Sequence, residues 1–122
     1  FITSHFEGPY KVGAASASVA GAYDGEFGFD KKTVKPHADA AVAVLTQACG
    51  AGTYTANAET DILEKGCAGF GSLPKADCGT DYDLVKIDGD KLHFGKRPVD
   101  NNMCSPEKRP KEIESTPLKK SI

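Results

Sequence analysis

Apolar and polar residues alternate over several short stretches, the pattern of strands in an antiparallel sheet. Residues 5–12 alternate at even spacing, and residues 82–87 and 91–94 do so on either side of a glycine. Alternation places apolar side chains on one face of a half-buried strand. About seven or eight strands fit a chain of 122 residues. We therefore expect an all-β antiparallel meander, either a small barrel or a sandwich.

The dipeptide Asp-Gly occurs twice between apolar residues, at Asp24-Gly25 and Asp88-Gly89. A two-residue hairpin turn needs positive φ, which glycine adopts at little cost. Both sites are therefore predicted to be hairpin turns. Their registers give each hairpin an apolar face, and the faces together would form the interior. We expect this interior to be lined by Phe27, Phe29, Val85, Leu92 and Phe94, and the same residues form the predicted ligand-binding surface.

Residues 38–48 fit two structures. Ala41, Leu45 and Ala48 have helical spacing, and Pro36 with Asp39 is typical of a helix start. The run from Ala41 to Leu45 also fits a buried strand, and periodicity does not decide a short apolar run. Because the surroundings are β and two valines lie in the run, we favour a strand.

The four cysteines, Cys49, Cys67, Cys78 and Cys104, predict two disulfides. No pair has the C-x-x-C spacing of a redox motif or a zinc site. Pairing Cys49 with Cys67 and Cys78 with Cys104 closes a local loop in each case, and we favour it. Disulfides form in oxidising compartments, so we expect a secreted protein. A first residue other than Met fits removal of a secretory signal, and no apolar run could span a membrane.

Charge is unevenly distributed along the chain. Residues 91–122 carry 8 basic and 4 acidic side chains, although the whole chain has a net charge of −2. After Phe94 no aromatic residue lies among the basic residues of this region, so nucleic-acid binding is not expected. We expect one β domain over residues 1–104 and a polar, proline-rich tail over residues 105–122, with a short edge strand near residues 116–119. The oligomeric state is left open.

Candidate catalytic and metal-binding groups are sparse. His5, His37 and His93 share no ligand spacing, and the acids around Asp88 and Asp90 lack the ligand pattern of an EF-hand loop. No nucleophile elbow, zinc-protease, Walker or dinucleotide motif is present. We therefore expect no metal, no cofactor and no catalytic residue. An acid–base enzyme would have to use His93 with Asp83 or Tyr82, or His37 with Asp39.

Three short motifs resemble the lipocalin family. Gly8-Pro9-Tyr10 is similar to the G-x-W signature with Tyr in place of Trp, Thr80-Asp81-Tyr82 is similar to T-D-Y, and Arg97 lies where the third motif has its arginine. The resemblance implies an eight-stranded barrel whose mouth takes a small apolar ligand. It also implies that Tyr10, Asp81 and Arg97 close the barrel without contacting the ligand.

Three functions are consistent with these features. The first is a secreted β-barrel module that binds an apolar small molecule such as a lipid or pigment, because an eight-stranded barrel can hold one small ligand. The second is a secreted surface-interaction or structural domain. The third is a small β-barrel isomerase, cyclase or hydrolase. The absence of catalytic motifs places the enzyme last.

Overall fold

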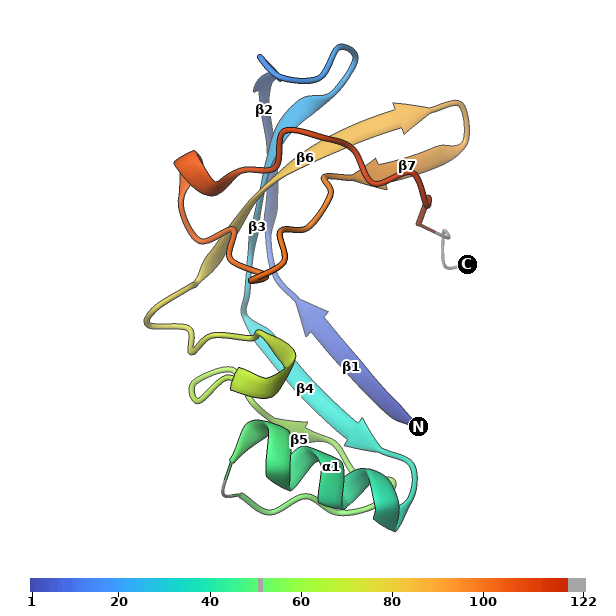
Figure 1. The fold of residues 1–122 in the computed structure, drawn as a ribbon, viewed down its shortest axis with the longest axis vertical. Helices are drawn as coiled ribbons and strands as arrows, with labels where there is room; N and C mark the ends of the chain where they lie inside the picture. The colour runs from blue at the N-terminus through green and yellow to red at the C-terminus, as the bar shows by residue number, and fades with distance from the viewer. Residues whose placement is uncertain (51, 119–122) are drawn as a thin grey trace. The chain divides into compact units, whose positions relative to one another are not determined.

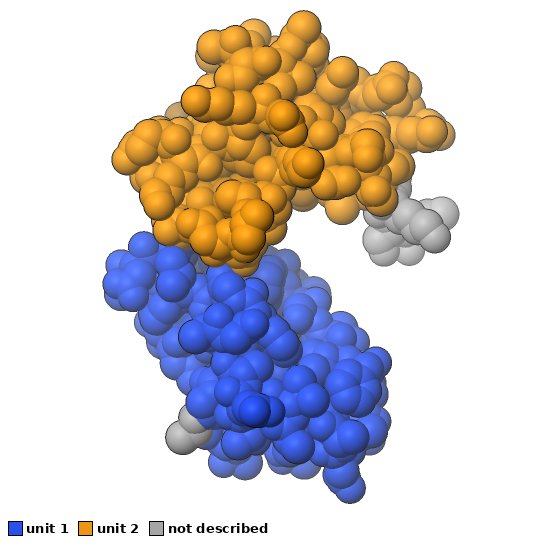
Figure 2. All heavy atoms as spheres, in the orientation of Figure 1, with its two compact units in different colours: residues 1–9, 29–79 blue, residues 10–28, 80–122 orange. Residues whose placement is uncertain are grey.

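The computed structural model of the chain describes residues 1–50 and 52–118. Two compact units are coloured separately in Figure 2: unit 1 contains residues 1–9 and 29–79, and unit 2 contains residues 10–28 and 80–122. Seven strands, one α-helix and two 3₁₀ helices are described (Figure 1). They are β1 (Ile2–Glu7), β2 (Tyr10–Ala15), β3 (Tyr23–Gly28), β4 (Lys31–Pro36), α1 (Asp39–Cys49), β5 (Thr60–Asp61), η1 (Ala68–Phe70), β6 (Thr80–Asp88), β7 (Lys91–Phe94) and η2 (Pro106–Lys108).

Unit 1 is a three-stranded antiparallel sheet, in the order β1-β4-β5, with α1 packed against β4 (Figure 1). Its core consists of Val34, Leu45, Tyr54, Ile62 and Cys67, all buried. Cys67 is bonded to Cys49 at the end of α1. The disulfide therefore fixes the helix to the loop that follows β5, as the favoured pairing predicted.

The strand predicted for residues 38–48 is wrong, because this segment is the helix α1. Ala41 and Leu45 are one turn apart and fully buried. The helix places both on the face that covers the sheet, and Asp39 in its first turn is favourable for the helix dipole. This burial outweighs the β preference of Val42 and Val44.

Unit 2 is a four-stranded antiparallel sheet in the order β2-β3-β6-β7. The hairpin predicted at the second Asp-Gly is confirmed, but its turn lies one residue further along the chain than predicted, so Val85 pairs with Phe94 and not with Leu92. Asp88 pairs with Lys91, so the two turn residues are Gly89 and Asp90. Gly89 has φ 65°, the conformation that a hairpin turn requires at its first central residue.

The hairpin predicted at Asp24-Gly25 is wrong, because both residues lie inside β3. Gly25 pairs with Val12 on one side and with Asp83 on the other. The strand expected over residues 5–12 is also two strands. It divides at Gly8-Pro9, and β1 and β2 belong to different sheets.

The barrel, one of the two predicted architectures, is also wrong. The described strands form two open antiparallel sheets, and the outer strands of neither sheet pair with each other. Over the residues that the structure describes, the fold is therefore β-rich with one short α-helix and forms no closed barrel. No helix among residues 1–50 and 52–118 is long and apolar enough to cross a membrane.

The second pair of predicted disulfide cysteines is also oxidised. Cys78 and Cys104 are disulfide-bonded, and the chain has no free cysteine. Two disulfides indicate folding in an oxidising compartment.

Candidate functional site

One face of the unit 2 sheet collects apolar side chains from all four strands. The registers align Tyr10 with Phe27, and Tyr23 with Val85 and then Phe94. Because side chains alternate between the faces of a strand, residues two apart on each strand share this face. We call it the apolar face. Its apolar members are Tyr10, Val12, Tyr23, Phe27, Val85, Ile87, Leu92 and Phe94.

Much of the apolar face is open to solvent. Tyr10 is 74% exposed and Ile87 is 72% exposed, while Val12 and Tyr23 are each 49% exposed. The remaining four apolar members are half-buried. Contiguous exposed apolar side chains, unlike scattered ones, mark interaction sites.

Gly25 allows the centre of the apolar face to pack. A Cβ at this position would lie 2.8 Å from Cγ2 of Val85 and 3.1 Å from the ring of Phe27. The missing side chain of Gly25 therefore leaves room for the ring of Phe27. This ring packs against the ring of Phe94, and the two centroids are 5.0 Å apart. Gly25 was predicted to be a turn residue, but in the structure its lack of a side chain leaves space for the neighbouring side chains.

Two buried carboxylates, those of Asp81 and Asp83, lie on the same face of the sheet as the apolar residues. Asp81 is aligned with Phe27, and its Oδ2 lies 3.2 Å from Nη2 of Arg97. Tyr10, Asp81 and Arg97, the residues of the lipocalin resemblance, thus belong to one region of unit 2. Their proximity does not depend on a barrel.

Asp83 is held by the backbone around it. Its Oδ1 accepts hydrogen bonds from the N–H groups of Leu84 (2.7 Å) and Gly95 (2.9 Å). Burial raises the pKa of Asp83, and the nearby charge of Asp81 adds to that rise. The two N–H donors and the charge of Arg97 act in the opposite direction and lower the pKa of Asp83.

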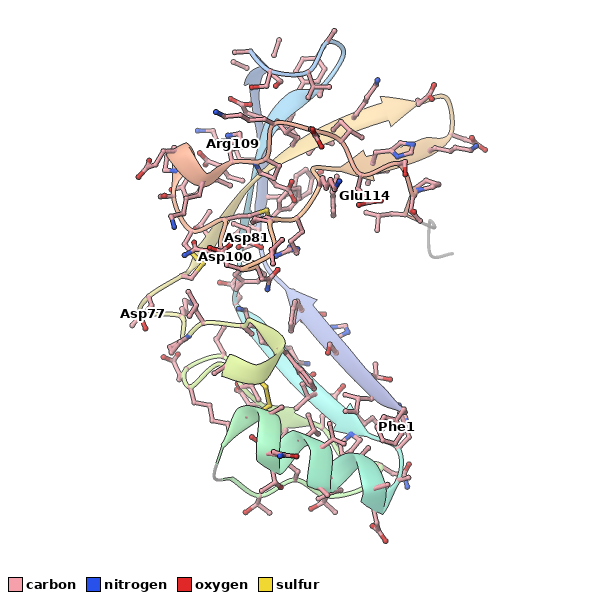
Figure 3. All side chains as sticks on the ribbon, in the orientation of Figure 1. Phe1, Asp77, Asp81, Asp100, Arg109 and Glu114 are labelled. Carbon is pink, nitrogen blue, oxygen red and sulfur yellow. A yellow bond between two sulfur atoms is a disulfide. The ribbon has the colours of Figure 1, made fainter. Side chains whose placement is uncertain are left out.

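The opposite face of this sheet is covered by the C-terminal segment. Arg109 reaches β3 and β6 from that segment (Figure 3). Its guanidinium lies 5.5 Å from the ring of Tyr82 and 3.8 Å from Oδ1 of Asp24. Leu84 on the same face is 1% exposed. On the apolar face, the end that carries Asp81 and Asp83 is buried, whereas Tyr10, Val12, Tyr23 and Ile87 are exposed and open to a partner.

The predicted ligand-binding residues do not all lie in the same unit of the structure. Phe27, Val85, Leu92 and Phe94 share the apolar face of unit 2, whereas Phe29 belongs to unit 1. There the ring of Phe29 packs edge-on against Phe6 with centroids 6.0 Å apart. Both rings contact the ammonium group of Lys32, which also donates to Oγ of Ser72. Phe29 therefore belongs to the packing of unit 1.

The candidate acid–base pairs make other contacts. Nε2 of His37 lies 2.6 Å from Oγ1 of Thr3, and Nδ1 of His93 lies 2.9 Å from the carbonyl oxygen of Glu114. His5 contacts Glu7 across 3.0 Å on the exposed surface of β1. No two histidines meet in these contacts, and the four cysteine sulfurs are held in disulfides, which prevents their use as thiolate ligands.

Sequence reasoning missed part of the apolar face. The prediction that Val85, Leu92 and Phe94 share one side agrees with the observed registers, because alternation about one turn fixes their shared side. Sequence reasoning missed Tyr23 because the wrong turn at Asp24-Gly25 hid the pairing of β3 with β2 and β6. The even spacing of Tyr10 and Val12 was the available signal. The sequence matches no protein-family model and no curated protein.

Proposed function

We propose that the protein is a secreted binding module that recognises an apolar surface of a partner protein through the apolar face of unit 2. The observation that carries the proposal is the exposure of Tyr10, Val12, Tyr23 and Ile87 on one face of one sheet. Aromatic residues are enriched at protein interfaces. The phenolic hydroxyls of the two tyrosines can also make hydrogen bonds at the rim of such an interface.

The electrostatics of the apolar face agree with this function. Asp81 and Asp83 are its only acidic residues by register among the described strands, and both are buried. Charged residues such as Lys11, Glu26 and Lys86 lie on the opposite face. The exposed part of the apolar face therefore carries no acidic or basic side chain by register, and depletion of charge is typical of the core of a protein–protein interface.

A partner protein fits the open sheet better than a small ligand does. Small-molecule sites are concave and bury most of the ligand surface. The barrel interior first expected for an apolar ligand is not formed by the two open sheets. An open sheet face instead suits a second apolar surface of similar extent, as in the surface-interaction alternative. Secretion is part of this proposal, and the two disulfides support it by indicating an oxidising compartment.

Site-specific photo-crosslinking tests the proposal. A benzophenone amino acid replaces Ile87 on the apolar face or, as the matched control, Lys86 on the opposite face of the same strand. Each protein is irradiated in the extracellular fluid of its source. We expect a protein adduct from position 87 and none from position 86. Unlabelled wild-type protein should abolish the adduct, and the Ile87→Lys variant should not.

Two results would contradict the proposal. Equal adducts from both positions would place the partner elsewhere. Absence of a protein adduct, together with a change in tyrosine fluorescence on adding lipids, would indicate the small-ligand function instead. The chain has no tryptophan and 4 tyrosines, so Tyr10 and Tyr23 would contribute to such a signal.

A further inference from the structure

β1 is an outer strand of the unit 1 sheet, and the described residues leave one of its edges without a paired strand. It pairs with β4 through six consecutive residues, from Ile2 to Glu7, without a register shift. Residues 3–7 are exposed. A free edge of this kind presents backbone N–H and C=O groups that can bind another strand.

The register identifies the backbone groups on that edge. The N–H of His37 donates to the carbonyl oxygen of Phe1 across 2.9 Å. In an antiparallel pair, hydrogen-bonded positions alternate with positions whose backbone groups point away. Residues 2, 4 and 6 therefore direct their N–H and C=O groups to the free edge. The partner of Ile2 on β4 is Pro36, which has no N–H to donate and fits this assignment.

The other outer strands of the described sheets carry features that discourage strand addition. β2 contains Lys11 and a register shift after Val12. β5 is only two residues long, and β7 is bridged by the C-terminal segment through Leu92. Lysine, bulges, short length and covering segments protect sheet edges. From Ile2 to Glu7, β1 has no lysine, no proline and no register shift.

The polarity of residues 2–6 of β1 is symmetric about Ser4. Ile2 and Phe6 are apolar, and Thr3 and His5 are polar. If two copies of β1 pair antiparallel about a two-fold axis at Ser4, Ile2 faces Phe6 of the second copy and Thr3 faces His5 of the second copy. Within residues 2–6 each side chain then meets one of its own polarity, Glu7 lies opposite Phe1 of the second copy, and like charges are not opposed. A two-fold interface requires this self-complementarity.

We propose that β1 mediates dimerisation by antiparallel pairing with β1 of a second copy, in the register centred on Ser4. Residues 2, 4 and 6 of each copy supply the backbone hydrogen bonds. One strand from each copy makes a small interface, so the dimer forms in a concentration-dependent manner. This inference does not rest on the apolar face, which belongs to unit 2.

Sedimentation velocity over a wide concentration series tests the dimer with two variants at Ser4. Ser4→Pro removes the N–H that faces the free edge and leaves the hydrogen bonds to β4 intact. Ser4→Ala keeps this N–H and is the matched control. We expect Ser4→Pro to weaken dimerisation by about tenfold or more, because each dimer loses two hydrogen bonds. Ser4→Ala should dimerise like the wild type. A wild type that stays monomeric throughout, or a folded Ser4→Pro that dimerises unchanged, would overturn the proposal.

A charge-pair experiment tests the register and does not depend on the folding of the proline variant. Ser4→Lys and Ser4→Glu each place like charges opposite one another across the two-fold axis, so each variant alone should dimerise less than the wild type. An equimolar mixture places opposite charges together and should recover dimerisation. Native mass spectrometry distinguishes the mixed dimer from both homodimers. A mixture with no preference for the mixed dimer would show that Ser4 does not lie at the axis and would overturn the proposed register.

Discussion

The Nη1 atom of Arg109 donates a hydrogen bond of 2.6 Å to the backbone carbonyl oxygen of Asp83. The same nitrogen donates to the carbonyl oxygen of Gly25 across 2.8 Å. One side chain of the C-terminal segment therefore binds two neighbouring strands of the unit 2 sheet. This contact fixes the segment to the sheet, while Tyr10, Val12, Tyr23 and Ile87 of the apolar face stay exposed.

Replacing Arg109 should destabilise unit 2. Arg109→Ala leaves two partly buried carbonyl oxygens without their charged donor, so we expect a loss of about 3 kcal/mol in the free energy of unfolding. Urea denaturation followed by circular dichroism measures this change. Lys108→Ala, at the exposed neighbouring position, is the control and should change stability by less than about 0.5 kcal/mol. Equal effects of the two variants would contradict the role assigned to Arg109.

Gly25 and Gly13 should respond differently to alanine. A Cβ at Gly25 meets Val85 at 2.8 Å, whereas a Cβ at Gly13 has its nearest neighbour, the carbonyl oxygen of Asp24, at 3.7 Å. We expect Gly25→Ala to cost about 1–3 kcal/mol of unfolding free energy, because the side chains on the apolar face must shift. Gly13→Ala should be tolerated. Thermal unfolding compares the two variants, and a tolerated Gly25→Ala would mean that the glycine is not needed for packing.

The free energy of unfolding should fall as pH rises through the range in which Asp83 loses its proton. Its pKa in the folded state is raised above the usual value of the unfolded chain, so the folded state holds the proton more tightly between those two values. Stability therefore decreases with rising pH across that interval and is unaffected by this group above it. Asp83→Asn removes the titration but keeps an oxygen that can accept from Gly95.

Urea denaturation from about pH 3 to about pH 8 measures this effect. The stability of the wild type relative to Asp83→Asn should decline with rising pH and then become constant. A wild type whose stability relative to Asp83→Asn instead rises with pH would mean that the hydrogen bonds outweigh burial.

Removing the Cys49–Cys67 bond should loosen unit 1. The two cysteines are separated by 18 positions, and the loop entropy of such a link corresponds to about 3 kcal/mol. The double variant Cys49→Ala, Cys67→Ala should lower the free energy of unfolding by about this amount under oxidising conditions. Hydrogen exchange should locate the added flexibility in α1 and the loop around Cys67. An unchanged unfolding midpoint would mean that packing of α1 alone determines stability.

The two Asp-Gly sites explain how far the sequence could predict the fold. Asp88-Gly89 forms a turn close to the predicted position because its strands pair with each other, so local sequence contains the needed information. Asp24-Gly25 has the same residues but lies between two partner strands. Its partners, Val12 and Asp83, are distant in the sequence. Local preference cannot reveal such pairing, since long-range contacts override turn propensity.

Other features of the fold were also predictable where local sequence determines them and were not where distant contacts determine them. The Cys49–Cys67 pairing was predictable because it closes a short loop. The helix α1 had the correct spacing in Ala41 and Leu45, but the choice between helix and strand depended on the sheet it covers. Half of the apolar face was predictable from the second hairpin. The contributions of Tyr10 and Tyr23 required the pairing of β2 with β3.

The affinity of the cross-linked partner for variants of the apolar face tests the central claim most directly. Isothermal titration calorimetry with that partner compares the wild type with Ile87→Ser, on the apolar face, and Lys86→Ser, on the opposite face of the same strand. We predict that Ile87→Ser weakens binding by about tenfold or more and that Lys86→Ser leaves the affinity nearly unchanged. Wild-type affinity in Ile87→Ser together with weakened binding in Lys86→Ser would contradict the claim that the apolar face is the binding surface.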